Sequence, residues 1–178
     1  MSKNYSISIN LNGQALENVQ YCQNILKDKF SITYMSEKSV QPHINIISGE
    51  SNKINSIINI LKGFNPPPDR STNIIGLGIL LTPAPLLYLR FTNTVFLQQL
   101  RKYIYKNTST MWSKLDETTD KNFWIPKSTI AFRDFSVQQI SGVIDSLDSI
   151  KFQCLMSMEE LCIMECLDQE IEIERFKI

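Results

Sequence analysis

Two short segments of the chain place a basic side chain beside a small polar one. Both begin with proline and read Pro42-His43-Ile44-Asn45 and Pro126-Lys127-Ser128-Thr129. In a β-strand successive side chains point to opposite faces, so His43 shares a face with Asn45, and Lys127 shares one with Thr129. A cation beside a hydrogen-bonding group, presented twice, suits a site that holds a phosphate between two parts of a protein.

The hydrophobic pattern around these segments predicts alternating strands and helices. The expected strands are 5–11, 41–47, 74–81, 86–92, 124–132, 152–158, 161–167 and 171–176. The expected helices are 15–30, 51–64, 94–105 and 136–147, with Ser51, Thr94 and Ser136 at their starts. The proline run 65–69 is expected to be a stiff connector, and the polar stretch 107–122 is interpreted as a loop.

Composition predicts one compact unit without a strongly charged surface. The chain has 178 residues, 43% of them hydrophobic, which is enough for one domain with a sizeable core. Its formal net charge is zero and its pI is about 6.6, so binding to long duplex nucleic acid or to an anionic membrane is not expected. The apolar run 74–81 is too short to cross a bilayer and no signal-peptide pattern opens the sequence, so a cytoplasmic location is expected.

Cysteine and histidine usage argues against a metal site. The four cysteines, Cys22, Cys154, Cys162 and Cys166, form no Cys-x-x-Cys pair, and we expect them to be reduced and structural. His43 is the single histidine, so a histidine-rich metal site is excluded and any imidazole chemistry depends on this residue.

With these motifs, the sequence resembles the two-histidine (2H) phosphoesterase superfamily, also called LigT-like or 2'-5' RNA ligase-like proteins. The resemblance rests on 42–45, 75–78, 86–91 and 124–131 and covers nearly the whole chain. It implies an α/β (α+β) fold of two pseudo-symmetric lobes, each an antiparallel-rich sheet with helices outside, around a central cleft in a single domain, 1–178. It also implies metal-independent chemistry without a cofactor, on a small nucleotide or an RNA terminus carrying a 2',3'-cyclic phosphate or a 2'-5' linkage.

The sequence departs from the family pattern at two positions. Asn45 stands where the first motif has Thr or Ser, and Lys127 stands where the second has histidine. The family reaction uses one histidine as general base and the other as general acid, whereas a lysine with a pKa near ~10.4 exchanges protons poorly at neutral pH. The resemblance therefore implies catalytic roles for His43 and Thr129, phosphate contacts from Asn45 and Lys127, and weak or absent turnover.

Two further side chains are candidates for ligand contacts. Tyr88 and Arg90 share one face of their strand, where Tyr88 would stack on a base and Arg90 would reach a phosphate. The alternative is an ordinary exposed sheet face, and Lys127 has the same alternative as a solvated strand residue. Trp124 is expected to pack rather than stack.

Three functions stay open from the sequence. The chain is a phosphodiesterase with residual activity, a binding module that captures a nucleotide or RNA end as a sensor, adaptor or sequestering protein, or a scaffold whose cleft has lost its role. The retained charge of Lys127, without its proton-transfer capacity, favours the binding module.

Overall fold

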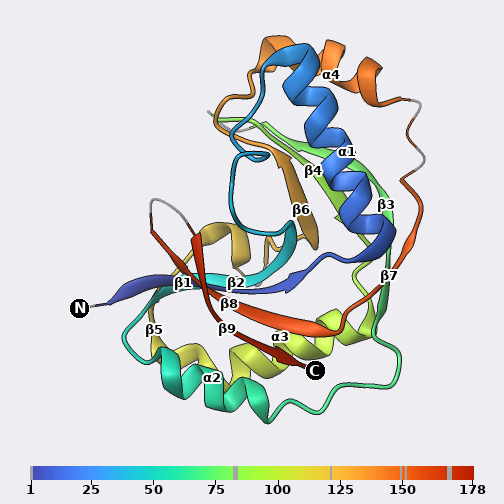
Figure 1. Cartoon of the computed structure of the whole chain (residues 1–178). Coiled ribbons are helices and arrows are strands. Elements are labelled where there is room, and N and C mark those ends of the chain that lie inside the picture. The colour runs from blue at the N-terminus through green and yellow to red at the C-terminus, as the bar shows by residue number, and fades with distance from the viewer. Residues whose placement is uncertain (1, 82–83, 121, 149, 151, 168–169) are drawn as a thin grey trace.

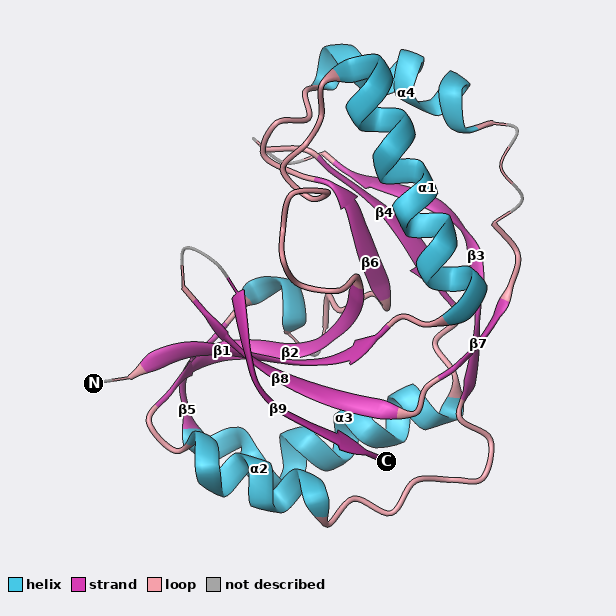
Figure 2. Cartoon of the chain, viewed as in Figure 1, coloured by secondary structure: helices cyan, strands magenta, loops and turns pink. Residues whose placement is uncertain are grey.

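The computed structural model describes residues 2–81, 84–120, 122–148, 150, 152–167 and 170–178, and they form two antiparallel sheets (Figure 2). The first sheet has the order β5-β2-β1-β8-β9. Its strands are β1 (Lys3–Asn10), β2 (His43–Ser51), β5 (Trp112–Leu115), β8 (Glu160–Cys166) and β9 (Glu170–Lys177). The second sheet has the order β6-β4-β3-β7. It contains β3 (Ser71–Leu80), β4 (Leu86–Phe91), β6 (Lys127–Ala131) and β7 (Leu155–Ser157).

Helices cover the outer side of each sheet (Figure 1). Helices α1 (Gly13–Phe30) and α4 (Ile140–Leu147) lie outside the second sheet, and α2 (Ile54–Lys62) and α3 (Val95–Thr108) lie outside the first. Three short 3-10 helices, η1 (Ser109–Met111), η2 (Glu117–Thr119) and η3 (Val137–Gln139), join these elements. The two-lobed α+β architecture that the sequence predicted is therefore confirmed.

The first helix of each half of the chain crosses to the other lobe. Helix α1 follows β1 of the first sheet but packs against β6 of the second. Helix α3 follows β4 of the second sheet but lies beside α2 under the first, where buried Arg101 donates a hydrogen bond to the carbonyl of Ile46 in β2. Each lobe is thus built from both halves of the sequence.

The core lies between the sheets and their helices. Ile7, Ile44 and Ile46 of the first sheet belong to the same buried cluster as the apolar residues of α2 and α3, and none of the three is exposed to solvent. Burying a side chain of this size stabilises the fold by about 1.5–3 kcal/mol. The face of β1 and β2 opposite these isoleucines is the one directed at the second sheet.

Most predicted elements are confirmed, but several bounds change: the strand expected over 124–132 spans only Lys127–Ala131, and the helix expected over 136–147 starts as the 3-10 turn η3 before α4 begins at Ile140. Helix α2 begins at Ile54 rather than at Ser51, whose Oγ accepts a hydrogen bond from the Lys53 amide (3.0 Å) and donates one to the Met111 carbonyl (2.7 Å). Segment 107–122 is not a plain loop, because it contains the end of α3, η1, β5 and η2.

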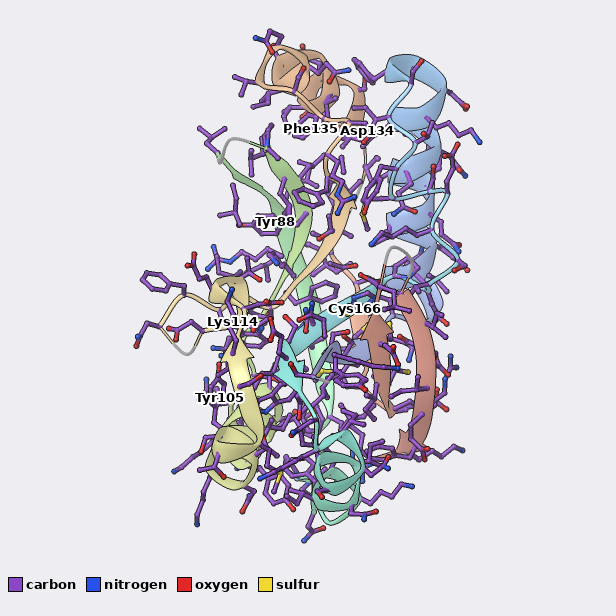
Figure 3. All side chains as sticks on the ribbon, turned by 90° about the vertical axis from the view of Figure 1, so that its left-hand side faces the viewer. Tyr88, Tyr105, Lys114, Asp134, Phe135 and Cys166 are labelled. Atoms are coloured by element: carbon purple, nitrogen blue, oxygen red, sulfur yellow. The ribbon has the colours of Figure 1, made fainter. Side chains whose placement is uncertain are left out.

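Strand β5 forms the edge of the first sheet by pairing with β2, through Trp112, Lys114 and Leu115. The pair needs glycine at position 49, where a Cβ would lie 2.2 Å from the carbonyl oxygen of Lys114. Figure 3 shows Lys114 on this strand. A pairing of this kind depends on tertiary contact, which a pattern of polar residues does not reveal.

One predicted strand near the C-terminus is shorter in the structure. The strand expected over 152–158 is limited to Leu155–Ser157. The turn expected at 168–169 and part of the connection at 82–85 lie outside the described residues.

Among the helices of the described chain, none combines the length and apolar character needed to cross a membrane.

Candidate functional site

The two motifs meet at a cavity of about 360 Å³ between the sheets. His43 and Asn45 reach it from β2, and Lys127 and Thr129 reach it from β6. The structure therefore brings together the four motif residues that the sequence singled out, although 84 positions separate His43 from Lys127 in the sequence. Antiparallel strands packed face to face can place such distant residues in one site.

The two motif strands have the same irregularity at the same offset. In β2 the pairing with β1 shifts between Ile47 and Asn45, and in β6 the pairing with β4 shifts between Ala131 and Thr129. Each shift is a β-bulge three residues after the basic side chain, at Ile46 and Ile130. Because a bulge reverses the alternation of faces, the cavity also receives Ser48 and Phe132, each five residues after the basic side chain.

The same symmetry extends to the backbone that precedes each motif. The carbonyl of Pro42 accepts a hydrogen bond from the Leu11 amide (2.8 Å), and that of Pro126 accepts one from the Phe91 amide (2.9 Å). The prolines cannot donate to a strand ladder, so only their carbonyls take part in the pairing. The two motifs are thus held in equivalent positions by equivalent strands.

His43 has its imidazole oriented by the backbone. Its Nδ1 lies 3.0 Å from the carbonyl oxygen of Gln41, which can only accept, so we assign the proton to Nδ1 and leave Nε2 as an acceptor. Burial lowers the pKa of His43, while the Gln41 hydrogen bond and the charge of Glu170 oppose that shift. A neutral imidazole with an available Nε2 can accept a proton from water or a ribose hydroxyl.

Lys127 is a cation without a counterion inside the cavity. No carboxylate of the described residues lies within 4.0 Å of its ammonium group, and burial lowers its pKa. Its charge also contributes to the lowered pKa of His43, so the two side chains act on one space. A partly desolvated ammonium without a partner is costly, and an anionic ligand would offset that cost.

Asn45 contributes an amide that the protein itself leaves unused. Its Oδ1 is buried and has no hydrogen-bond partner among the described residues. Its backbone carbonyl accepts a hydrogen bond from the Trp124 indole nitrogen (2.8 Å), so Trp124 packs as the sequence predicted. Buried polar groups are normally satisfied, so Oδ1 has room for a hydrogen-bond donor from a ligand or water, whereas only Nδ2 of the same amide can donate to a phosphate oxygen.

Tyr88 and Arg90 lie on the same sheet face as the second motif, but neither is among the residues that line the cavity. Tyr88 is paired in register with Thr129, and Arg90 with Lys127. The Tyr88 ring (Figure 3) covers Gly78, where a Cβ would lie 2.3 Å from a ring atom, and only 5% of the residue is exposed. Arg90 is exposed. Their expected ligand contacts stay a prediction.

Several lining residues come from segments that the sequence gave no reason to single out. They are aromatic or charged and include Tyr34 and Lys38 after α1, Asp116 after β5 and Glu170 of β9. Lys38 and Glu170 form an ion pair (3.1 Å) at the cavity. Lys38, Asp116 and Glu170 were visible in the sequence only as charged residues in predicted loops, and such residues are common on any protein surface.

One carboxylate fixes the segment that carries Tyr34 and Lys38. Asp134 accepts hydrogen bonds from the backbone amides of Thr33 (2.6 Å) and Tyr34 (2.7 Å). Figure 3 shows Asp134 beside the chain that follows α1. The preceding residue, Arg133, has a left-handed backbone (φ 69°), a conformation that costs energy in a residue with a side chain. The cavity wall is thus tied to the end of the second motif strand.

Within the described part of the chain, no three His, Cys, Asp or Glu side chains lie together in a way that could hold a metal ion. The four cysteines are free thiols. Burial raises the pKa of Cys22 and of Cys162 to about 12, so these two thiols are protonated and unreactive at neutral pH. Cys166, labelled in Figure 3, has its pKa raised for the same reason.

Comparison with known proteins identifies the fold. No protein-family model matches the sequence, and no curated protein does. Among solved structures, E. coli LigT in its apo form is similar, with a TM-score of 0.62, 11% identity, and coverage of 100% of this chain and 98% of that chain. E. coli LigT complexed with 3'-AMP gives a TM-score of 0.63 at 12% identity, covering 100% and 99%.

A structure described as a phosphoesterase gives the same result, with a TM-score of 0.62, 13% identity, and coverage of 100% of this chain and 99% of that chain. These similarities extend over the whole length of both chains at low identity, as expected where an architecture persists while sequences diverge. The chain therefore has the fold of E. coli LigT, which is the fold that the resemblance of its motifs predicted.

Proposed function

We propose that the cavity binds a phosphate group of a small nucleotide or of an RNA end. Lys127 supplies the positive charge, Asn45 and Thr129 supply hydrogen bonds, and His43 lies against the ligand from the opposite sheet. The observation that carries this proposal is the ammonium of Lys127, which is held in the cavity without a carboxylate partner among the described residues. An anion is the partner that this arrangement lacks.

The fold supports the chemical class of the ligand. Structures of E. coli LigT, which has this fold, are complexed with 3'-AMP, ATP, phosphate and NADP+. These ligands share phosphate groups, and three of them are nucleotides. A site between two equivalent strands, each with a basic residue, would contact a phosphate from both sides.

Calorimetric titration with 3'-AMP tests the proposal. We expect wild-type protein to bind and Lys127→Gln to bind about 10- to 150-fold more weakly, because a hydrogen bond to a charged group contributes roughly 1.5–3 kcal/mol. Lys102→Gln is the matched control, since it removes the same charge from the exposed face of α3. Equal binding by wild type and Lys127→Gln, or none by wild type, would contradict the proposal.

Slow hydrolysis is a second candidate function, and the orientation of His43 favours it. Nε2 of His43 would take a proton from water, the water oxygen would form the new bond to phosphorus, and the bond from phosphorus to the leaving oxygen would break. The leaving oxygen would take its proton from the ammonium of Lys127, whose pKa is lowered from its ordinary value by burial. No other reactant is needed for this step.

Hydrolysis of a 2',3'-cyclic nucleotide and of a 2'-5' dinucleotide distinguishes a weak enzyme from a receptor. If the protein is a weak enzyme, wild type turns over, His43→Ala does not, and Lys127→His is faster, because general acid catalysis is typically worth 100- to 10,000-fold. If wild type binds these ligands without turnover and Lys127→His gains hydrolysis, the site is a receptor with a phosphoesterase fold. Turnover that survives His43→Ala would rule out this catalytic role.

A further inference from the structure

A second cavity adjoins the one that holds the two motifs. It has a volume of about 810 Å³ and shares Asp116, Thr118 and Lys127 with the motif cavity. Its remaining wall is largely apolar and contains Leu80, Leu115, Phe123 and Ile125. A ligand whose phosphate lies at Lys127 can therefore extend directly into this second cavity.

The backbone amides of Phe123 and of its neighbour Trp124 are hydrogen-bonded, and yet the Phe123 side chain is solvent-exposed. The amides of Phe123 and Trp124 both donate hydrogen bonds to the Asp120 carbonyl (3.2 and 3.0 Å). Trp124 is fixed by its bond to Asn45 and by the Arg101 guanidinium, 4.1 Å from its ring centre. Phe123 is 75% exposed, so it adds little to the core and presents a ring for stacking.

Carboxylates surround this apolar wall. Asp116, Glu117 and Asp120 line the second cavity, and Lys127 is the one cation among its described lining residues. Lys121, nearby in sequence, lies outside the described residues. Three carboxylates near one another would repel further phosphate groups, so a continuing nucleic-acid strand fits this cavity poorly.

Glu117 differs from the other two carboxylates. Asp116 already accepts a hydrogen bond from Ser48 (2.6 Å), and Asp120 accepts one from the Asn122 amide (2.8 Å). The Glu117 side chain has no hydrogen bond or ion pair with any described residue. An ionised carboxylate accepts hydrogen bonds only, so its complement on a ligand is a donor such as an amino group.

Building on the proposed function, we propose that the second cavity holds the base of a short nucleotide whose phosphate lies at Lys127. The base stacks on Phe123, and Glu117 favours a base that carries an exocyclic amino group. The three carboxylates disfavour a ligand with additional phosphates beyond the base. The substrate class is thus a mononucleotide or short nucleotide with an amino-bearing base, rather than a long RNA strand.

Cytidine and uridine 2',3'-cyclic phosphates are a suitable pair of probes, because they differ at position 4 of the base, where cytidine has an amino group. We expect wild-type protein to bind the cytidine compound more tightly and Glu117→Gln to reduce that preference. Phe123→Ala should weaken binding of both about 5- to 150-fold, since base stacking on an aromatic ring is worth roughly 1–3 kcal/mol. Affinity for inorganic phosphate should not change in Phe123→Ala, which removes no charge.

Tyr21→Ala is the matched control, because Tyr21 is an aromatic residue on α1 that is 57% exposed and lines neither cavity. Equal affinity for the two cyclic nucleotides, or unchanged affinity in Phe123→Ala, would overturn this inference while leaving phosphate binding at Lys127 intact. Tighter binding of a three-nucleotide strand with the same cyclic end would overturn the exclusion of longer RNA. If wild type binds neither nucleotides nor phosphate, the proposed function itself fails.

Discussion

The indole nitrogen of Trp124 lies 2.8 Å from the backbone carbonyl oxygen of Asn45 and donates a hydrogen bond to it. Trp124 stands three residues before Lys127, and Asn45 belongs to the first motif. This bond joins the chain that enters one motif strand to the other motif strand. It therefore sets the position of the two halves of the site relative to each other, and it also anchors the turn that carries Phe123.

We expect Trp124→Phe to lower both stability and nucleotide affinity. The variant keeps an aromatic ring for the Arg101 guanidinium but loses the bond to Asn45, which should reduce the free energy of unfolding by about 1 kcal/mol. Urea unfolding and titration with 3'-AMP measure the two effects. Trp112→Phe is the control, because it loses a comparable bond to Thr108 (3.0 Å) away from the cavity. Loss of affinity in both variants alike would contradict a specific role for Trp124.

Stability should fall as the pH drops below about 6.5, and His43 should account for the change. Burial lowers the pKa of His43 in the folded protein, so between that pKa and 6.5 the unfolded chain binds more protons than the folded one. The stability contribution is therefore complete above pH 6.5 and is lost as the pH falls through the folded pKa. Urea unfolding between pH 5 and 8 measures this slope.

His43→Gln provides the control for that measurement, since His43 is the only histidine in the chain. The slope between pH 5 and 6.5 should be smaller in the variant, and an unchanged slope would show that another group causes it. A single imidazole proton resonance reports the same titration directly. Its pKa should rise when phosphate is bound, because a nearby anion favours the protonated imidazole.

Lys127→Met should stabilise the free protein while abolishing phosphate binding. Burial lowers the pKa of Lys127, which means that the folded state disfavours its charged form, and an apolar side chain removes that penalty. We expect a higher melting temperature and no detectable binding of 3'-AMP. Lys102→Met, on the exposed face of α3, should change neither quantity appreciably. A lower melting temperature in Lys127→Met would show that the ammonium stabilises the fold.

Replacing Asp134 should loosen the cavity wall that carries Tyr34 and Lys38. Asp134→Ala leaves the amides of Thr33 and Tyr34 without their acceptor, which should cost about 1–3 kcal/mol of stability. Hydrogen exchange of these two amides should accelerate, and nucleotide affinity should fall. Asp145→Ala is the control, because Asp145 is an exposed aspartate on α4 that lines neither cavity. Unchanged protection of both amides would contradict the tether.

The alternation of side chains along each motif determined much of the site from the sequence alone. A strand of period two puts His43 beside Asn45 and Lys127 beside Thr129 wherever the strand lies, and the structure has both pairs at one cavity. The apolar stripes also predicted the helices, because they are local, but of the predicted starts only Thr94 directly precedes an α-helix, while Ser136 precedes the 3-10 turn η3 and α2 begins after Ser51. Local chemistry of this kind depends only on neighbouring residues.

Tertiary structure alone decided the rest of the site. The bulges at Ile46 and Ile130 bring Ser48 and Phe132 to the cavity, but an isoleucine in a bulge looks like any other apolar strand residue. Strand β5 forms by pairing with β2, and the backbone beside Phe123 is held by the bond from Trp124 to Asn45, and both partners lie far away in sequence. Such contacts form between distant segments, so their energies depend on the folded arrangement and leave no periodic signal in the chain.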